Sequence, residues 1–198
     1  MAGRPREFDR QAALEQARDA FWARGYEGIS MADLVELLGL ASARIYAAFG
    51  SKEALFREAV ALYEAGEGGF VGRALAEEPT ARRAIERMLR EAAETYTQAG
   101  RPQGCMVVTA ATNYARDNEP VFAWLSKLRR AQTDAIVARL RQAVAAGELK
   151  AGANAQALGD CFASLLNGLS VQARDGTPRA RLLALIAPAL QVLDAERA

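Results

Sequence analysis

The sequence contains no histidine and only two cysteines among its 198 residues. The absence of histidine excludes Ser-His-Asp and Cys-His catalysis, HExxH zinc sites and imidazole proton shuttles. Two cysteines without histidine cannot complete an ordinary structural zinc site. Cys105 and Cys161 each lie in an apolar helical pattern, so we expect two buried, reduced thiols, with a redox or metal role as the alternative. We therefore expect no cofactor, no metal and no catalytic residue.

Long apolar runs are also missing. No stretch is long enough to cross a membrane, and charged residues follow the start at once, unlike a signal peptide. The glycines at 66, 68 and 69 follow a helical pattern instead of a strand, so they do not predict a phosphate-binding loop. We therefore expect a cytoplasmic protein with no membrane partner.

The chain has little net charge. The formal value is +1, and the first sixty residues carry one more acidic than basic side chain. Bulk charge therefore gives no sign of a nucleic-acid partner. The local pattern is different, because Arg44 and Lys52 are the only charged residues between Leu37 and Lys52.

What the sequence has in quantity is helix-forming residues. Hydrophobic residues make up 51% of the chain, and alanine, leucine, arginine and glutamate dominate while glycine and proline stand apart as punctuation. This composition supports a real core and favours helices over sheets. We predict an all-α fold.

The first fifty residues have the pattern of three helices. Asp9 can cap a first helix that Gly25 ends. Ser30 and Asp33 fit a capping box at the start of a short second helix, which Gly39 ends. A third short helix follows up to Gly50, and Ser51 can cap a fourth. Two short helices joined by a glycine turn behind a longer helix are typical of a helix-turn-helix.

Residues 4–60 resemble the DNA-binding domain of the TetR/AcrR family nearly continuously. The resemblance is carried by Gly25-Tyr26, Ser30-Met31-Ala32-Asp33-Leu34, Leu38-Gly39-Leu40, Ile45-Tyr46-Ala47-Ala48-Phe49 and Ser51-Lys52-Glu53-Ala54-Leu55-Phe56. This chain departs from the family at Ala41, where Ser or Thr is frequent, so capping can fall to Ser42. It also has Arg44 where the family often has a small or hydroxyl residue.

The resemblance implies a transcriptional regulator, expected to be a repressor, with a DNA-binding domain at 1–50 and a helical ligand-binding and dimerisation domain at 51–198. Its partners are then palindromic double-stranded operator DNA, a second copy of itself and an unknown small effector. Arg44 is the expected base reader, because its guanidinium can bond guanine O6 and N7 together. The other expected DNA-binding residues are Ser30, Met31, Ser42, Ala43, Tyr46, Lys52, Arg4 and Arg6.

Beyond residue 60 the interpretation depends on helical periodicity. We predict helices over 51–71, 80–98, 104–113 and 120–146, then one capped by Asn154 and a last one that starts with Thr177 as its cap. Pro188 lies inside the last helix and should kink it near Ala184.

The second domain has candidate residues for two sites. The resemblance implies an effector cavity, and the candidate lining residues are Tyr63, Phe70, Met88, Tyr96, Met106, Asn113, Phe122 and Phe162. We see no inward cluster of like charges, which favours an apolar or aromatic effector, with Asn113 and Arg116 as possible polar anchors. The last two helices are very apolar and predict a four-helix dimer interface that includes Leu158, Phe162, Leu165, Leu169, Leu182 and Ile186. Burial within one subunit is the alternative for each of these residues.

Two other functions stay open on the residues alone. One is a small helical enzyme that acts on an apolar ligand with carboxylates or tyrosine, although we find no acid–base pair for it. The other is a helical interaction module without a DNA role. Salt-dependent binding to duplex DNA separates the regulator from both.

Overall fold

The structure, a computed structural model, describes residues 9–110 and 118–198. Throughout these ranges the regular elements are helices, which confirms the predicted all-α class. The N-terminal domain contains α1 (Arg10–Arg24), α2 (Met31–Leu38) and α3 (Ser42–Phe49). The rest contains α4 (Lys52–Ala65), a 3-10 turn (Glu67–Gly69), α5 (Phe70–Glu77), α6 (Ala81–Tyr96), α7 (Met106–Thr109), α8 (Glu119–Ala145), α9 (Ala155–Arg174), α10 (Arg179–Ala184) and α11 (Ile186–Asp194).

Local capping fixes the N-terminal helices as predicted. Asp9 accepts a hydrogen bond from the Ala12 amide at 3.0 Å. Ser30 and Asp33 form the full capping box of α2, in which the Asp33 amide donates to Ser30 Oγ and the Ser30 amide donates to the Asp33 carboxylate. Gly39 ends α2 with φ of 62°, a left-handed conformation that glycine adopts without strain.

The start of α3 differs from the prediction. Ala41 occupies the N-cap position and offers no side-chain hydrogen bond, and Ser42 is already the first helical residue. The prediction that capping falls to Ser42 is therefore wrong. The alanine cap gives the first amides of α3 no side-chain acceptor, and the Arg44 amide donates instead to the Ala41 carbonyl oxygen at 2.9 Å.

The predicted helix over 51–71 is divided. α4 ends at Ala65, Gly66 caps it, and the chain turns through the 3-10 segment before α5 begins at Phe70. A Cβ atom at Gly68 would lie 2.4 Å from the ring of Tyr63, so only glycine permits this close return. Periodicity missed the break because apolar residues continue on both sides of the glycines.

The other helices follow the predictions with small differences. Asn154 caps α9 by accepting from the Ala157 amide at 3.0 Å, as predicted. α10 begins at Arg179 with Pro178 in the cap position, so the predicted Thr177 cap is wrong by one residue. The kink expected from Pro188 is present as a break at Leu185 between α10 and α11. The described part of the predicted helix over 104–113 contains only the four residues of α7.

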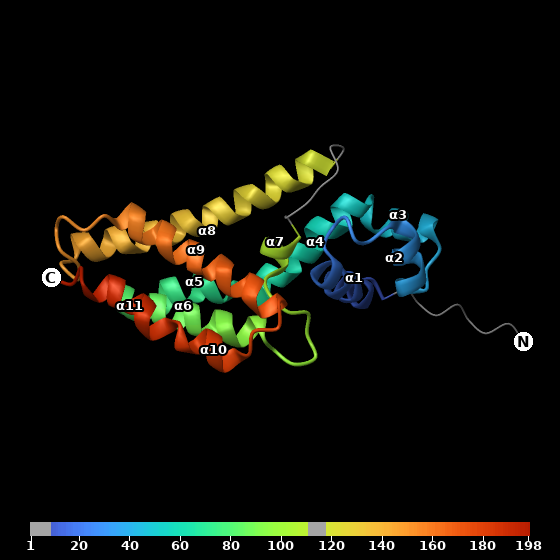
Figure 1. Cartoon of the computed structure of the whole chain (residues 1–198). Coiled ribbons are helices and arrows are strands. Elements are labelled where there is room, and N and C mark those ends of the chain that lie inside the picture. The colour runs from blue at the N-terminus through green and yellow to red at the C-terminus, as the bar shows by residue number, and fades with distance from the viewer. Residues whose placement is uncertain (1–8, 111–117) are drawn as a thin grey trace, which may run out of the picture.

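The molecule is elongated, with the N-terminal helices at one end and the carboxyl terminus at the other (Figure 1). α4 runs from the first group into the second, where α8 packs on α9, and α6 packs on α5, α9 and α11. Aromatic side chains join α1 to α4: the Phe56 ring lies 5.1 Å from that of Phe21 and 5.0 Å from that of Tyr26. The first residues of the second domain are therefore part of the same core as the first domain, although the predicted boundary at residue 50 stays a prediction. None of the described helices is long and apolar enough to span a membrane.

Candidate DNA interface and ligand site

The third helix divides its side chains between core and solvent. Ile45 and Phe49 are buried, with 1% and 4% of their surfaces exposed. The predicted DNA-binding residues of this helix, Ser42, Ala43, Arg44 and Tyr46, are all exposed. The inward pair holds the helix on its domain, so the outer face can meet a partner without unpacking the core.

The start of α2 lies in the same small domain. Ser30 is exposed and Met31 is half-buried. The Ser30 hydroxyl is already engaged with Asp33, and the hydrogen bonds from Ser30 hold the pKa of the Asp33 carboxyl below its ordinary 3.8. The capping box therefore already occupies the Ser30 and Asp33 amides at this helix end.

Lys52 is held against an aromatic ring. Its ammonium nitrogen lies 4.2 Å from the centroid of Tyr26, a cation–π contact that fixes the side chain at the start of α4. Partial burial lowers the pKa of Lys52, and the nearby Glu27 and Asp33 oppose that shift. The predicted residues Arg4 and Arg6 lie outside the described residues.

Three of the predicted pocket residues meet around one cavity of about 30 Å³ between α4, α5, α6 and α8. Tyr63, Phe70 and Tyr96 line it. Met88, Met106, Phe122 and Phe162 are buried in the core but do not line this cavity, and Asn113 and Arg116 lie outside the described residues. The remaining lining residues are Glu64, Gly68, Cys105, Val107, Val108, Leu128, Arg129 and Gln132.

Sequence reasoning missed the polar members of this cavity. Cys105 is buried, as predicted, but it lies beside the two tyrosines instead of in a purely apolar setting. Arg129 reaches the cavity from α8 and donates a hydrogen bond to the Val107 carbonyl oxygen at 3.2 Å. No local sequence signal identifies either residue, because the cavity is assembled from segments far apart in the chain.

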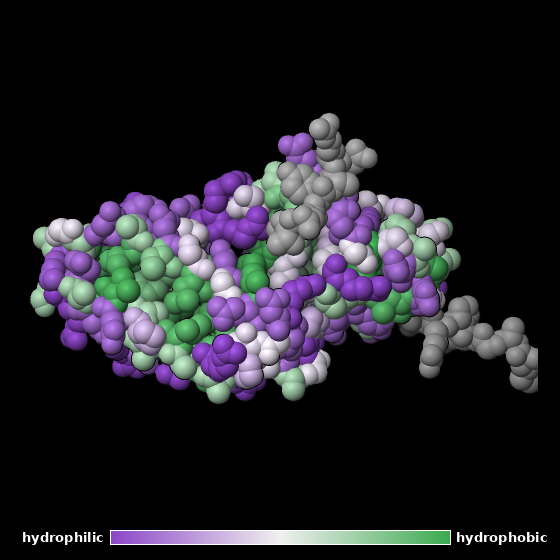
Figure 2. Space-filling view, in the orientation of Figure 1, coloured by the Kyte–Doolittle hydropathy of each residue, from purple (hydrophilic) through white to green (hydrophobic). Residues whose placement is uncertain are grey.

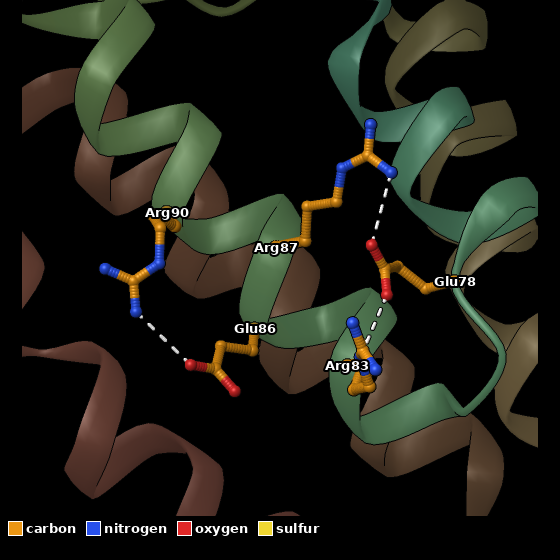
Figure 3. Close-up of a pocket in the computed structure, with 5 residues that line it drawn as sticks. All are labelled: Glu78, Arg83, Glu86, Arg87 and Arg90. Carbon is orange, nitrogen blue, oxygen red and sulfur yellow. Dashed lines mark hydrogen bonds and ion pairs between the residues drawn. The ribbon is translucent and has the colours of Figure 1, made fainter.

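A second hollow lies on the outer surface of α6 and is strongly charged (Figure 3). Arg83 and Arg87 both reach Glu78, with nitrogen–oxygen distances of 3.1 and 3.2 Å, and Arg90 reaches Glu86 at 3.2 Å. Each arginine in this hollow already has a carboxylate partner. The cluster therefore ties the α5–α6 connection to α6 and leaves little unsatisfied charge for a ligand.

The predicted dimer residues lie mostly inside the subunit. Leu158, Phe162, Leu169, Leu182 and Ile186 are buried in the core of the single chain, and Leu165 is half-buried. The solvent face of α9 instead presents Cys161 and Val171, and α11 presents Val192. The expectation of a buried Cys161 is therefore wrong for the single subunit. Figure 2 shows apolar surface gathered over the half of the molecule where α9 and α11 lie.

Comparisons with known proteins agree with this architecture. A family model described as bacterial regulatory proteins, tetR family, matches residues 13–59, and one described as tetracyclin repressor-like, C-terminal domain, matches residues 79–194. The chain therefore belongs to the tetR family of bacterial regulatory proteins, as the resemblance of its first sixty residues predicted. It is a DNA-binding regulator of transcription with a helix-turn-helix domain.

Individual relatives extend over nearly the whole chain. The transcriptional repressor ComR of Escherichia coli K12 is 29% identical over 191 residues, which are 96% of this chain and 91% of ComR. The repressor BdcR of the same organism is 30% identical, with 94% and 90% covered. A solved structure of the TetR family regulator CifR, a cysteine mutant complexed with 26-bp operator DNA, is 43% identical with a TM-score of 0.90 and covers 96% of this chain and 98% of its own.

Proposed function

We propose that the protein is a cytoplasmic repressor that binds a palindromic operator as a homodimer and leaves it when a small effector binds in the second domain. The observation that carries this proposal is the division of α3 into a buried pair, Ile45 and Phe49, and an exposed face with Arg44 and Tyr46. A helix of this kind can enter the major groove and read base edges from its first turn. The repressor names of ComR and BdcR and the operator complex of CifR support the same function.

Within this interface the residues have different roles. Arg44 reads a guanine, because its guanidinium matches the O6 and N7 acceptors. Tyr46, Lys52 and the start of α2 at Ser30 contact phosphates, which position the helix without reading sequence. Arg4 and Arg6 form an arm for the neighbouring minor groove. Met31, Ser42 and Ala43 line the same surface.

Selection of bound duplexes from a random DNA pool tests this function. We expect a palindromic consensus with half-sites about 34–36 Å apart, one helical turn. Arg44→Ala should lose the consensus at one position per half-site, a loss of about 1–3 kcal/mol in discrimination. Lys52→Ala, the matched control, should weaken all sequences equally and flatten the dependence on salt. A pool without any enriched sequence contradicts the proposal.

The homodimer interface is proposed on the outer faces of α9 and α11. Val171 and Val192 each expose 47% of their surface there, and side chains buried in one subunit, such as Leu182, support the face from below. Val171→Asp should convert the dimer to a monomer in sedimentation, since a charge would be trapped in an apolar interface. Leu37→Asp is the matched control, because Leu37 is 41% exposed but lies on α2. An intact dimer with Val171→Asp excludes this interface.

The effector is proposed to be small and largely apolar or aromatic. Phe70, Val107, Val108 and Leu128 supply the apolar part of the cavity wall, which supports that chemistry. α4 connects the cavity to the DNA-binding helices without an internal glycine or proline. A ligand that prefers a tilted state of α4 should lower operator affinity about 5–150-fold, and operator DNA should weaken the ligand by the same factor.

A further inference from the structure

The inner end of the cavity contains a polar group without a partner. The Tyr63 side chain is 1% exposed, and its hydroxyl is the buried side-chain atom that lacks a hydrogen-bond partner within the described residues. An unpaired buried hydroxyl lowers the stability of the folded protein. Such an atom is therefore rare unless it has a function or binds a partner molecule. The hydroxyl lines the cavity of about 30 Å³, which has room for one or two small groups.

The groups around this hydroxyl are mainly hydrogen-bond donors. Burial, and then the neighbouring Cys105, raise the pKa values of Tyr63 and Tyr96 well above the ordinary 10.0, so both hydroxyls keep their protons at neutral pH. Arg129 contributes a guanidinium, which has donors and no acceptor. Because Glu64 lines the same cavity and would repel an anion, a neutral acceptor suits this end better than a carboxylate.

We propose that the cavity receives the carbonyl or ether oxygen of a small neutral effector, and that the Tyr63 hydroxyl donates the hydrogen bond that holds it. This inference identifies the chemical class of the effector in the proposed function, but the binding step itself does not depend on operator release. Phe70 and Leu128, which line the same space, then contact the carbon atoms next to that oxygen.

Glycine at position 68 sets the position of this donor. A Cβ atom there would lie 2.4 to 3.0 Å from three atoms of the Tyr63 ring. The 3-10 turn between α4 and α5 therefore places the backbone of Gly68 directly against the Tyr63 ring. This close contact supports the ring on one side.

The donor is also connected to the DNA-binding domain. The Trp22 ring of α1 packs edge-on against the Tyr63 ring with centroids 4.8 Å apart. The indole nitrogen of Trp22 donates to the Gly104 carbonyl oxygen at 2.8 Å, and the amide of the next residue, Cys105, donates to Ser170 Oγ at 2.8 Å. A ligand that accepts a hydrogen bond from Tyr63 is therefore bound to a side chain whose ring contacts Trp22 of α1.

Two pairs of probes of matched shape test the hydrogen bond. Acetone and dimethyl ether are small and carry an acceptor oxygen, whereas isobutene and propane replace that oxygen with carbon. Calorimetry on the full-length protein should show each oxygen probe binding about threefold to tenfold more tightly than its hydrocarbon, as one neutral hydrogen bond provides. Tyr63→Phe should abolish that preference while hydrocarbon affinity persists. Tyr26→Phe is the matched control, since Tyr26 is 5% exposed and does not line the cavity.

Several outcomes overturn the proposal: equal affinities within each pair, a preference that survives Tyr63→Phe, or no binding by any of the four probes. Thermal unfolding of Tyr63→Phe controls for folding, and we expect no loss because the removed hydroxyl has no partner. Operator binding is measured separately. Oxygen-dependent binding without operator release would leave the site intact and count against the proposed induction instead.

Discussion

The exposed face of α3 and the cavity beneath α4 differ in whether their polar groups are solvated or buried. On α3 the polar side chains stand in solvent and the apolar ones, such as Ile45, are buried, so the helix can meet DNA as it is. In the cavity the Tyr63 hydroxyl is buried without a partner. Binding to duplex DNA requires a preformed surface. Sensing a ligand requires a site that binds the ligand more tightly in one conformation of the protein than in another.

Phe56 and Tyr46 contrast a fully buried aromatic residue with an exposed one. Phe56 is 0% exposed and joins α1 to α4, whereas Tyr46 is 47% exposed. Phe56→Ala should lower the free energy of unfolding by about 3–5 kcal/mol in denaturant titration. Tyr46→Ala should change it by less than about 0.5 kcal/mol but weaken operator binding. Equal effects on stability would remove the distinction between the two regions.

Two glycines test packing inside the second domain. A Cβ atom at Gly159 of α9 would lie 2.3 Å from the Val137 side chain and 3.1 Å from its Cα on α8. Gly159→Ala should therefore lower the free energy of unfolding by about 1–3 kcal/mol. Gly72→Ala in α5 meets open space and should raise it by up to about 1 kcal/mol through helix propensity. Thermal denaturation of both variants checks the opposite signs, and a stabilised Gly159→Ala would show that α8 and α9 separate easily.

The missing cap of α3 offers a smaller gain on the DNA-binding side. Ala41 provides no side-chain acceptor, whereas Ser51 caps α4 by accepting from the Ala54 amide at 3.0 Å. Ala41→Ser should raise the free energy of unfolding by about 1 kcal/mol, and Ser51→Ala should lower it by a similar amount. Chemical denaturation measures both. If Ala41→Ser is neutral, the first turn of α3 gains nothing from a side-chain acceptor.

The smallest expected effects are those of acid on one carboxylate in each region. Hydrogen bonds from Ser30 lower the pKa of Asp33, and those from Arg82 lower the pKa of Asp194, both below the ordinary 3.8. A lowered folded-state pKa adds stability that is present above 3.8 and is lost as pH falls through the folded value. Asp33→Asn and Asp194→Asn should each make unfolding less sensitive to pH in this acid range. An unchanged acid profile contradicts the assigned contact.

The sequence allowed prediction of features that depend on neighbouring residues. The caps at Asp9, Ser30 and Asn154 each satisfy an amide three residues away, so their chemistry can be recognised without a fold. The outer face of α3 was predictable for a similar reason, because Ile45 and Phe49 define its inner face by helical spacing.

Other features could not be predicted because distant segments create them. Tyr63, Tyr96, Cys105 and Arg129 come together only when four separate elements pack. The exposure of Cys161 depends on which face of α9 packs on α8. Because α9 has apolar residues on both faces, helical spacing does not show which face is buried. The break after Ala65 was missed because the pattern weighs apolar spacing more than three nearby glycines.

The ring contacts of α4 determine how this regulator can be recombined with its relatives. Phe21, Trp22 and Tyr26 of the first domain pack on Phe56 and Tyr63 of α4. A chimera that joined a foreign DNA-binding domain at residue 50 would separate these rings from their partners. An exchange limited to α2 and α3 separates none of them. New operator specificity is therefore easiest to graft as that two-helix segment, while α1 is inherited together with the ligand sensor.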